Sequence, residues 1–111
     1  MSVSADMQAR LARNEAAFRR INEDISKGRD RDDDTTLIGF VCECGKADCA
    51  RLIEMTPAEY EHVREDGRRF AVVPGHEIVA VEDVVARTDR FAVVRKTEEA
   101  GVVAKATDPR A

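Results

Sequence analysis

A chain of 111 residues with a formal net charge of −4 fits one domain and lacks the basic surplus of proteins that bind the nucleic-acid backbone. It contains no tryptophan, one tyrosine and four phenylalanines, so we expect a modest hydrophobic core that a metal ion helps to stabilise. No apolar run is long enough to span a membrane, and the N-terminus lacks the apolar stretch of a secretory leader. We therefore expect a cytoplasmic protein that binds neither membranes nor nucleic acid.

Residues 4–27 have the pattern of an amphipathic helix that Gly28 ends. On one side, Glu15, Arg19 and Glu23 form a charge ladder that is typical of a solvent-exposed helix face. We expect the apolar stripe of the helix to pack on the core, on a partner protein or on a second copy of the chain. This stripe consists of Met7, Leu11, Phe18, Ile21 and Ile25.

The composition divides the chain into three segments. Residues 28–36 contain no apolar side chain, which predicts a flexible acidic linker between the helix and the rest of the chain. The first segment is therefore the N-terminal helix with its linker, at 1–36. A core follows at 37–96. Residues 97–111 show no clear period and are expected to form a flexible tail.

Short strands and one inserted helix are predicted for the core. The apolar runs at 37–41 and 51–55 are expected to pair as a hairpin. Thr56 and Glu59, with Pro57 between them, form the capping box of a helix that Gly67 is expected to end. A strand at 70–73 and a hairpin of 79–86 with 91–95 complete the core. The expected fold class is α+β, with an N-terminal helix and a small antiparallel β core.

A cluster of three cysteines lies at the tip of the first predicted hairpin. Cys42, Cys44 and Cys49 cannot all pair with one another, and a reducing cytoplasm disfavours structural disulfides. Three thiolates and one imidazole form a common structural zinc site. The better fourth ligand is His76, in a Pro-Gly-His turn, because His62 lies in the middle of a helix and is expected to be exposed. The histidine favours zinc over iron.

A closed shell of four protein ligands leaves no position for a catalytic water, which predicts a structural metal. The chain also offers no nucleophile, base and orienting group that can be placed together, so we do not expect an enzyme. The alternative is a thiol-based redox switch, in which the three cysteines form alternative disulfides and Lys46 or Arg51 lowers the pKa of a thiol.

Several short motifs resemble a group of small, uncharacterised bacterial proteins that are frequent in actinobacteria. The motifs are Cys-x-Cys-x4-Cys with Pro-Gly-His-Glu, the Met-Thr-Pro-Ala-Glu-Tyr segment at 55–60, and the Asn-Glu and Phe-Arg pairs of the first helix. This resemblance implies a zinc-ribbon-like domain behind a helix and no particular activity. In this chain Ile78 and Val79 follow the Pro-Gly-His-Glu motif, where an acidic residue and a proline are commoner. We expect a zinc-binding regulatory or protein-interaction module.

Overall fold

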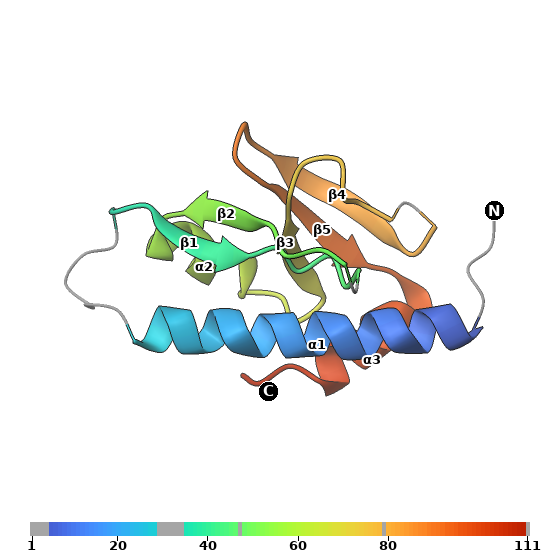
Figure 1. Ribbon diagram of the computed structural model, residues 1–111. Helices are drawn as coiled ribbons and strands as arrows, with labels where there is room; N and C mark the ends of the chain where they lie inside the picture. The colour runs from blue at the N-terminus through green and yellow to red at the C-terminus, as the bar shows by residue number, and fades with distance from the viewer. Residues whose placement is uncertain (1–4, 29–34, 47, 79, 111) are drawn as a thin grey trace.

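The computed structural model describes residues 5–28, 35–46, 48–78 and 80–110. Two small antiparallel sheets and three helices confirm the predicted α+β class. The helices α1 and α3 lie on one side of the sheets, whereas α2 lies at the level of the first hairpin (Figure 1). One sheet pairs β1 with β2, and the other has the order β3-β5-β4. The elements in chain order are α1 (Ala5–Lys27), β1 (Ile38–Val41), β2 (Leu52–Met55), α2 (Pro57–Val63), β3 (Arg69–Val72), β4 (Glu82–Arg87), β5 (Ala92–Lys96) and α3 (Glu98–Ala106).

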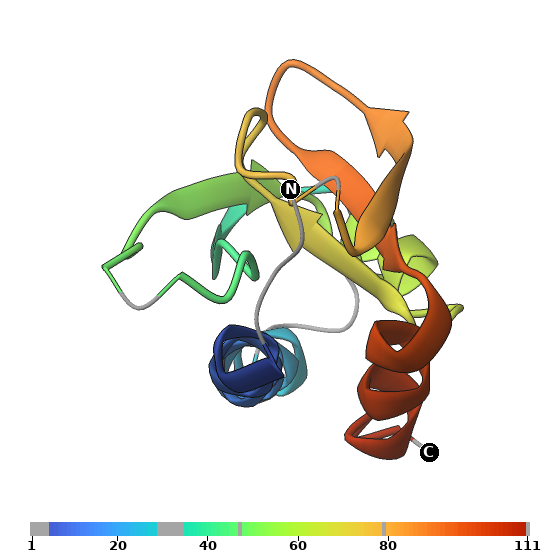
Figure 2. The ribbon, with the colours of Figure 1, turned by 90° about the vertical axis from the view of Figure 1, so that its right-hand side faces the viewer.

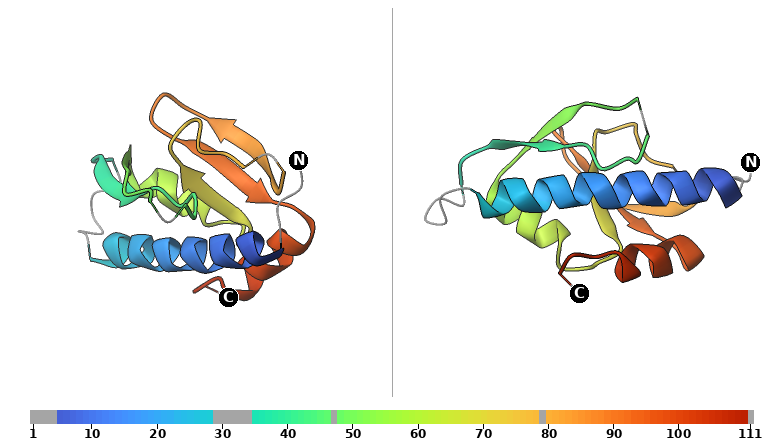
Figure 3. Two further views of the ribbon diagram at one scale, coloured as in Figure 1. Left: turned by 45° about the vertical axis from the view of Figure 1, so that its right-hand side comes forward. Right: turned by 60° about the horizontal axis from the view of Figure 1, so that its bottom comes forward.

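The helices α1 and α3 cover the same side of the molecule. Seen along its axis, α1 lies below the first hairpin, while α3 lies below the ends of β3 and β5 (Figure 2). The long α1 therefore crosses beneath both sheets, and its N-terminal half runs beside α3 (Figure 3). None of the helices in these described ranges is long and apolar enough to span a membrane.

The two predicted hairpins are present. In the first, Ile38 pairs with Met55 and Val41 with Leu52. In the second, β4 pairs with β5 and carries an irregularity between Val84 and Ala86. The predicted beginning of the second hairpin at residue 79 lies outside the described residues, and β4 itself starts three residues later, at Glu82.

The start of α2 matches its prediction, whereas its end does not. The Thr56 side chain accepts a hydrogen bond from the Glu59 N–H at 3.1 Å, and the Glu59 carboxylate accepts one from the Thr56 N–H at 2.8 Å. The helix ends at Val63, with Arg64 as its C-cap, before it reaches Gly67. The Arg64 N–H still donates to the Tyr60 carbonyl oxygen at 3.1 Å, and the buried Arg64 side chain binds Glu23 and Asp108.

The hydrophobic core lies between the two sheets and α2. The rings of Phe40 and Tyr60 stack there with centroids 4.6 Å apart, and Phe70 and Met55 are also buried. Valine and alanine side chains from β3 and β5 fill most of the remainder. Because the aromatic residues are few, the first hairpin depends on polar contacts as well as on this core.

The prediction of a solvent-exposed charge ladder on α1 is wrong. Glu15, Arg19 and Glu23 are buried, whereas Met7 and Ile21 of the apolar stripe are 48% and 46% exposed. The helix therefore packs on its polar face, and the apolar stripe lies on its flank. Ile25 is the member of the stripe that packs against the core.

The buried charges of α1 each have partners on other elements, which is what makes their burial possible. Arg19 donates hydrogen bonds to the carbonyl oxygens of Gly67 and Ala104, both at 2.7 Å. Its guanidinium also lies 4.5 Å from the centroid of the Phe70 ring. Glu23 accepts a hydrogen bond at 2.7 Å from Arg64, whose side chain is fully buried.

Residues 98–106, within the segment that was expected to form a flexible tail, instead form the helix α3. Gly101 lets this helix approach the sheet closely, since a Cβ atom there would lie 2.9 Å from the Lys96 carbonyl oxygen. After the helix, Asp108 pairs with Arg64, and Arg110 pairs with Glu23. Small residues and ion pairs thus attach the C-terminal segment to the rest of the fold. Neither produces the apolar periodicity by which a helix is recognised in a sequence.

Candidate metal centre

The first hairpin continues beyond its strands and positions two of the cysteines. The Cys42 N–H donates a hydrogen bond to the Arg51 carbonyl oxygen at 2.9 Å, and the Glu43 N–H donates one to Ala71 on β3 at 2.8 Å. The segment is therefore held on both edges in an extended form. Side chains alternate along an extended chain, so Cys42 and Cys44 point to one side and Glu43 to the other.

Glu43 anchors this segment from the side opposite the thiols. Its carboxylate is fully buried and accepts hydrogen bonds from the Ala71 N–H at 2.9 Å, the Asn22 amide at 2.9 Å and the Tyr60 hydroxyl at 3.1 Å. Burial raises the pKa of Glu43. The anchoring role of Glu43 was not predicted from the sequence. The only signal for it is an acidic residue between two cysteines in an otherwise apolar strand.

A tight turn leads from the second cysteine to the third. Gly45 has a φ of +80°, and a Cβ atom there would lie 2.7 Å from the Glu15 Cγ atom. Asn14 donates a hydrogen bond to the Gly45 carbonyl oxygen at 2.8 Å, so α1 is fastened to this turn. The Cys49 N–H then donates to the Lys46 carbonyl oxygen at 3.0 Å, which turns the chain back toward the thiols.

His76 reaches the cysteines from the turn that follows β3. The peptide N–H of His76 donates a hydrogen bond to the Val73 carbonyl oxygen at 2.9 Å, which closes a four-residue turn. Gly75 has a φ of +96° and follows Pro74, the arrangement of a type II turn. Proline and glycine are the residues that this turn favours at its two central positions, so the short motif places the imidazole beside the hairpin.

The four predicted ligands lie together. One donor atom from each of Cys42, Cys44, Cys49 and His76 lies within 4.8 Å of all the others. The His76 Nδ1 atom is 3.7 Å from the Cys42 Sγ atom and 3.6 Å from the Cys49 Sγ atom. A sulfur and a nitrogen bound to one tetrahedral Zn²⁺ are about 3.6 Å apart. The group can therefore hold a metal ion, and zinc is typical of such a donor set.

The pKa values of the two buried thiols, Cys42 and Cys44, shift in opposite directions. The Cys44 sulfur accepts a hydrogen bond from the Cys42 thiol, which lowers the pKa of Cys44 to about 4. The same bond, together with burial, raises the pKa of Cys42. Lys46 also lowers the pKa of Cys44, but it does so through its peptide N–H and not through the side-chain ammonium that the redox hypothesis invoked. The Val73 N–H donates a hydrogen bond to the Cys42 sulfur at 3.2 Å, which opposes the rise in the Cys42 pKa.

His62, the other candidate ligand, lies apart from the cluster. His62 has a side chain that is 74% exposed and faces Glu65, which confirms that it is a surface residue of α2. All three cysteines are free thiols. Cys42 and Cys44 are buried, whereas Cys49 and His76 are partly exposed at a surface depression that Asp48 and Arg51 also line.

No family model matches the chain, and neither the curated proteins nor the solved structures yield a match. The resemblance to the bacterial group thus remains an expectation from short motifs. The Cys3His cluster that was predicted from the cysteine spacing and the Pro-Gly-His turn is present in the fold.

Proposed function

We propose that this protein is a zinc-binding regulatory or protein-interaction module with a structural Cys3His site. The observation that supports the proposal is the convergence of four soft ligand atoms within 4.8 Å, from segments up to 34 residues apart. The distances between His76 Nδ1 and two of the sulfur atoms match those of a tetrahedral zinc shell.

A metal bound there would join separate parts of the fold. Cys42 and Cys44 follow β1, Cys49 precedes β2, and His76 follows β3. One ion would therefore connect the first hairpin to the second sheet. With four protein ligands the shell is closed, which supports a structural role over catalysis.

The two histidines provide a matched test of the site. In the His76→Ala variant we expect loss of bound zinc and of native circular dichroism, because the metal contributes on the order of 10 kcal/mol in small zinc domains. The His62→Ala variant removes an exposed imidazole and is expected to keep both properties. Zinc content measured by elemental mass spectrometry decides between the two histidines. Equal zinc content in both variants would exclude His76 as a ligand.

The exposed flank of α1 supports the interaction part of the proposal. Met7 and Ile21 are about half exposed there, while Leu11 and Phe18 between them are partly buried. This apolar flank is suited to a partner protein or a second copy of the chain.

An Ile21→Asp variant tests this surface. We expect it to abolish self-association or partner capture while the melting curve of the protein is retained, because Ile21 is not part of the core. Arg20→Asp, which introduces the same side chain on a different face of the helix, is the control. Light scattering that gives one and the same mass for the wild type and Ile21→Asp would remove self-association from the proposal.

A redox switch is the second candidate, favoured by three free thiols in one cluster with Cys49 partly exposed. Attack of a thiolate on hydrogen peroxide gives a sulfenic acid and hydroxide, and a second thiol then forms the disulfide and releases water. The two electrons go to the peroxide, and the lost ligands release the metal. A zinc-loaded protein that keeps all its thiols and its metal in excess peroxide would rule this function out.

A further inference from the structure

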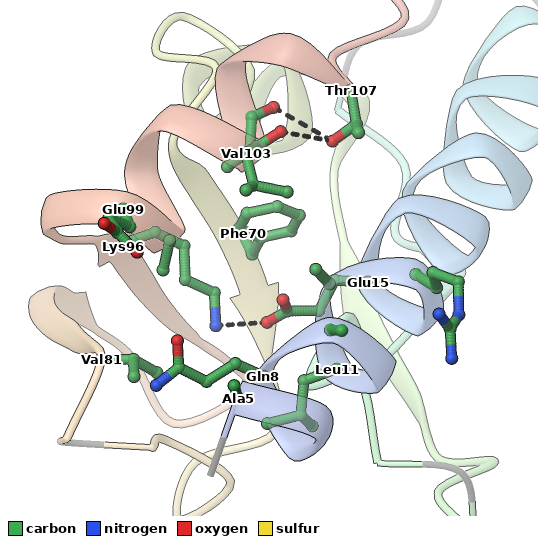
Figure 4. A pocket seen from close by; sticks show the side chains of 15 residues that line it. Ala5, Gln8, Leu11, Glu15, Phe70, Val81, Lys96, Glu99, Val103 and Thr107 are labelled. Atoms are coloured by element: carbon green, nitrogen blue, oxygen red, sulfur yellow. Dashed lines mark hydrogen bonds and ion pairs between the residues drawn. The ribbon is translucent and has the colours of Figure 1, made fainter. Parts of the chain in front are cut away.

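A cleft of about 430 Å³ lies between the N-terminal half of α1 and α3, apart from the metal centre (Figure 4). Its volume falls within the usual range for small-molecule sites, roughly 300 to 1,000 Å³. The cleft exists because the facing helices carry small side chains there, among them Ala9 and Ala12 on α1 and Ala100 and Ala104 on α3. Phe70 and Val103 add to its apolar walls.

One end of the cleft is polar and charged. Glu15 from α1 and Lys96 from β5 point toward each other there, with Phe70 beside them (Figure 4). Both side chains line the cleft, yet they are only 6% and 3% exposed. The Lys96 ammonium also binds Glu82. Two buried carboxylates thus face one buried ammonium at this end. The other charged side chains that line the cleft, Glu99 and Arg13, are exposed and opposite in sign.

The ion pair by itself explains how α1 is attached to β5, but it does not explain the open apolar volume beside it. A purely structural contact between α1 and α3 would be closed by larger side chains, as protein interiors normally are. Val103 instead remains 42% exposed at this cleft. The combination of apolar walls with a few convergent, buried polar groups is the usual composition of a ligand site.

The charge at the polar end selects the class of ligand. An anionic head group would meet the buried carboxylate of Glu15 in a poorly hydrated site, where like charges repel strongly. A cationic head group would instead balance the second carboxylate that Lys96 leaves uncompensated. We propose that this cleft binds a small organic cation, an ammonium group on an apolar body, with the ammonium at Glu15 and the body between α1 and α3.

The test uses hexylamine as the probe and the whole 111-residue chain, purified without a chelator. We expect saturable binding by isothermal titration and by amide chemical shifts in α1 and α3, with the millimolar affinity that suits so few non-hydrogen atoms. Hexanoate, which has the same chain length and an anionic head, is expected to bind at least tenfold more weakly. Equal or tighter binding of hexanoate, or no saturable binding of hexylamine, would overturn the proposal.

Three variants locate the site. Ala12→Leu fills the cleft and is expected to abolish hexylamine binding, whereas Ala17→Leu on the outer face of α1 leaves it unchanged. Glu15→Gln is expected to weaken binding about tenfold or more, because it removes a charge-assisted hydrogen bond. Unchanged affinity in a folded Ala12→Leu protein would place the ligand elsewhere and contradict the proposal. This outcome does not depend on the zinc site, since the cleft and the cysteine cluster share no residue.

Discussion

Single buried polar residues determine how this small fold is assembled. Glu43 connects the cysteine segment to β3, α1 and α2, because its carboxylate accepts three hydrogen bonds from these elements. Gly45 is needed at the adjacent turn, where its positive φ and the contact with α1 exclude a side chain. These residues lie beside the metal ligands and orient the segment that carries them.

At the same scale, Glu15 makes the stability depend on pH. Burial raises its pKa from 4.5 to about 7, against the opposing effect of Lys96, while Glu82 and Glu43 raise it further. Between these two values the folded state holds a proton that the unfolded state has released. The free energy of unfolding therefore falls as the pH rises from about 4.5 to 7, by about 2 to 3 kcal/mol from this one group.

Urea denaturation of the wild type and Glu15→Gln at pH 5 and pH 7.5 tests this contribution. The variant cannot titrate at this position, so its stability is expected to fall less steeply with pH. Glu99→Gln, an exposed site nearby, serves as the control and should keep the wild-type slope. Identical slopes in all three proteins would show that the Glu15 pKa is not raised by folding.

At the scale of elements, α1 is held to the first hairpin by side-chain hydrogen bonds. The Asn22 amide donates to the Val41 carbonyl oxygen and accepts from the Val41 N–H, both at 2.8 Å, and it also binds Glu43. The side chain thus takes the place of a neighbouring strand at the edge of β1. The apolar flank of α1 takes no part in these hydrogen bonds of Asn22.

The Asn22→Ala variant is expected to lower the free energy of unfolding by about 2 to 4 kcal/mol, because it leaves buried groups of Val41 and Glu43 without their partner. Arg20→Ala, at an exposed position on the same helix, is expected to change it by less than about 0.5 kcal/mol. Thermal or urea unfolding measures both. If the two variants lost the same small amount, α1 would be held by its apolar residues instead.

Local sequence signals predicted the elements, whereas the packing of the helices depends on distant partners. The capping box of α2 and the two hairpins follow from neighbouring residues, and the structure contains them. The burial of Arg19 could not be predicted in this way, because its acceptors on Gly67 and Ala104 lie 48 and 85 residues away. A charge ladder looks the same in sequence whether it faces water or buried counter-charges.

At the scale of the whole molecule, the described residues form one compact body. The radius of gyration is 13.2 Å, close to the ~13 Å expected for a single domain of this length. The N-terminal helix and the C-terminal segment are therefore parts of the same structure as the sheets. Ion pairs and hydrogen bonds supply much of this cohesion, as a chain with few aromatic residues requires.

The candidate metal site was the most predictable part of the molecule, although its ligands come from distant segments. Three cysteines are clustered in sequence, and the Pro-Gly-His motif defines a turn that places the imidazole at the end of a strand. The cleft between α1 and α3 left no such signal, since small residues on two helices and the distant Lys96 create it together. Its charged end became visible only in the fold.

Elemental analysis of the purified protein, combined with a thiol count and circular dichroism before and after chelation, tests the proposed structural zinc most directly. We expect about one zinc per chain, thiols that become reactive when the chelator removes the metal, and loss of the native spectrum at the same time. A protein without metal, or one that keeps its native spectrum after chelation has freed all three thiols, would contradict a structural zinc at this site.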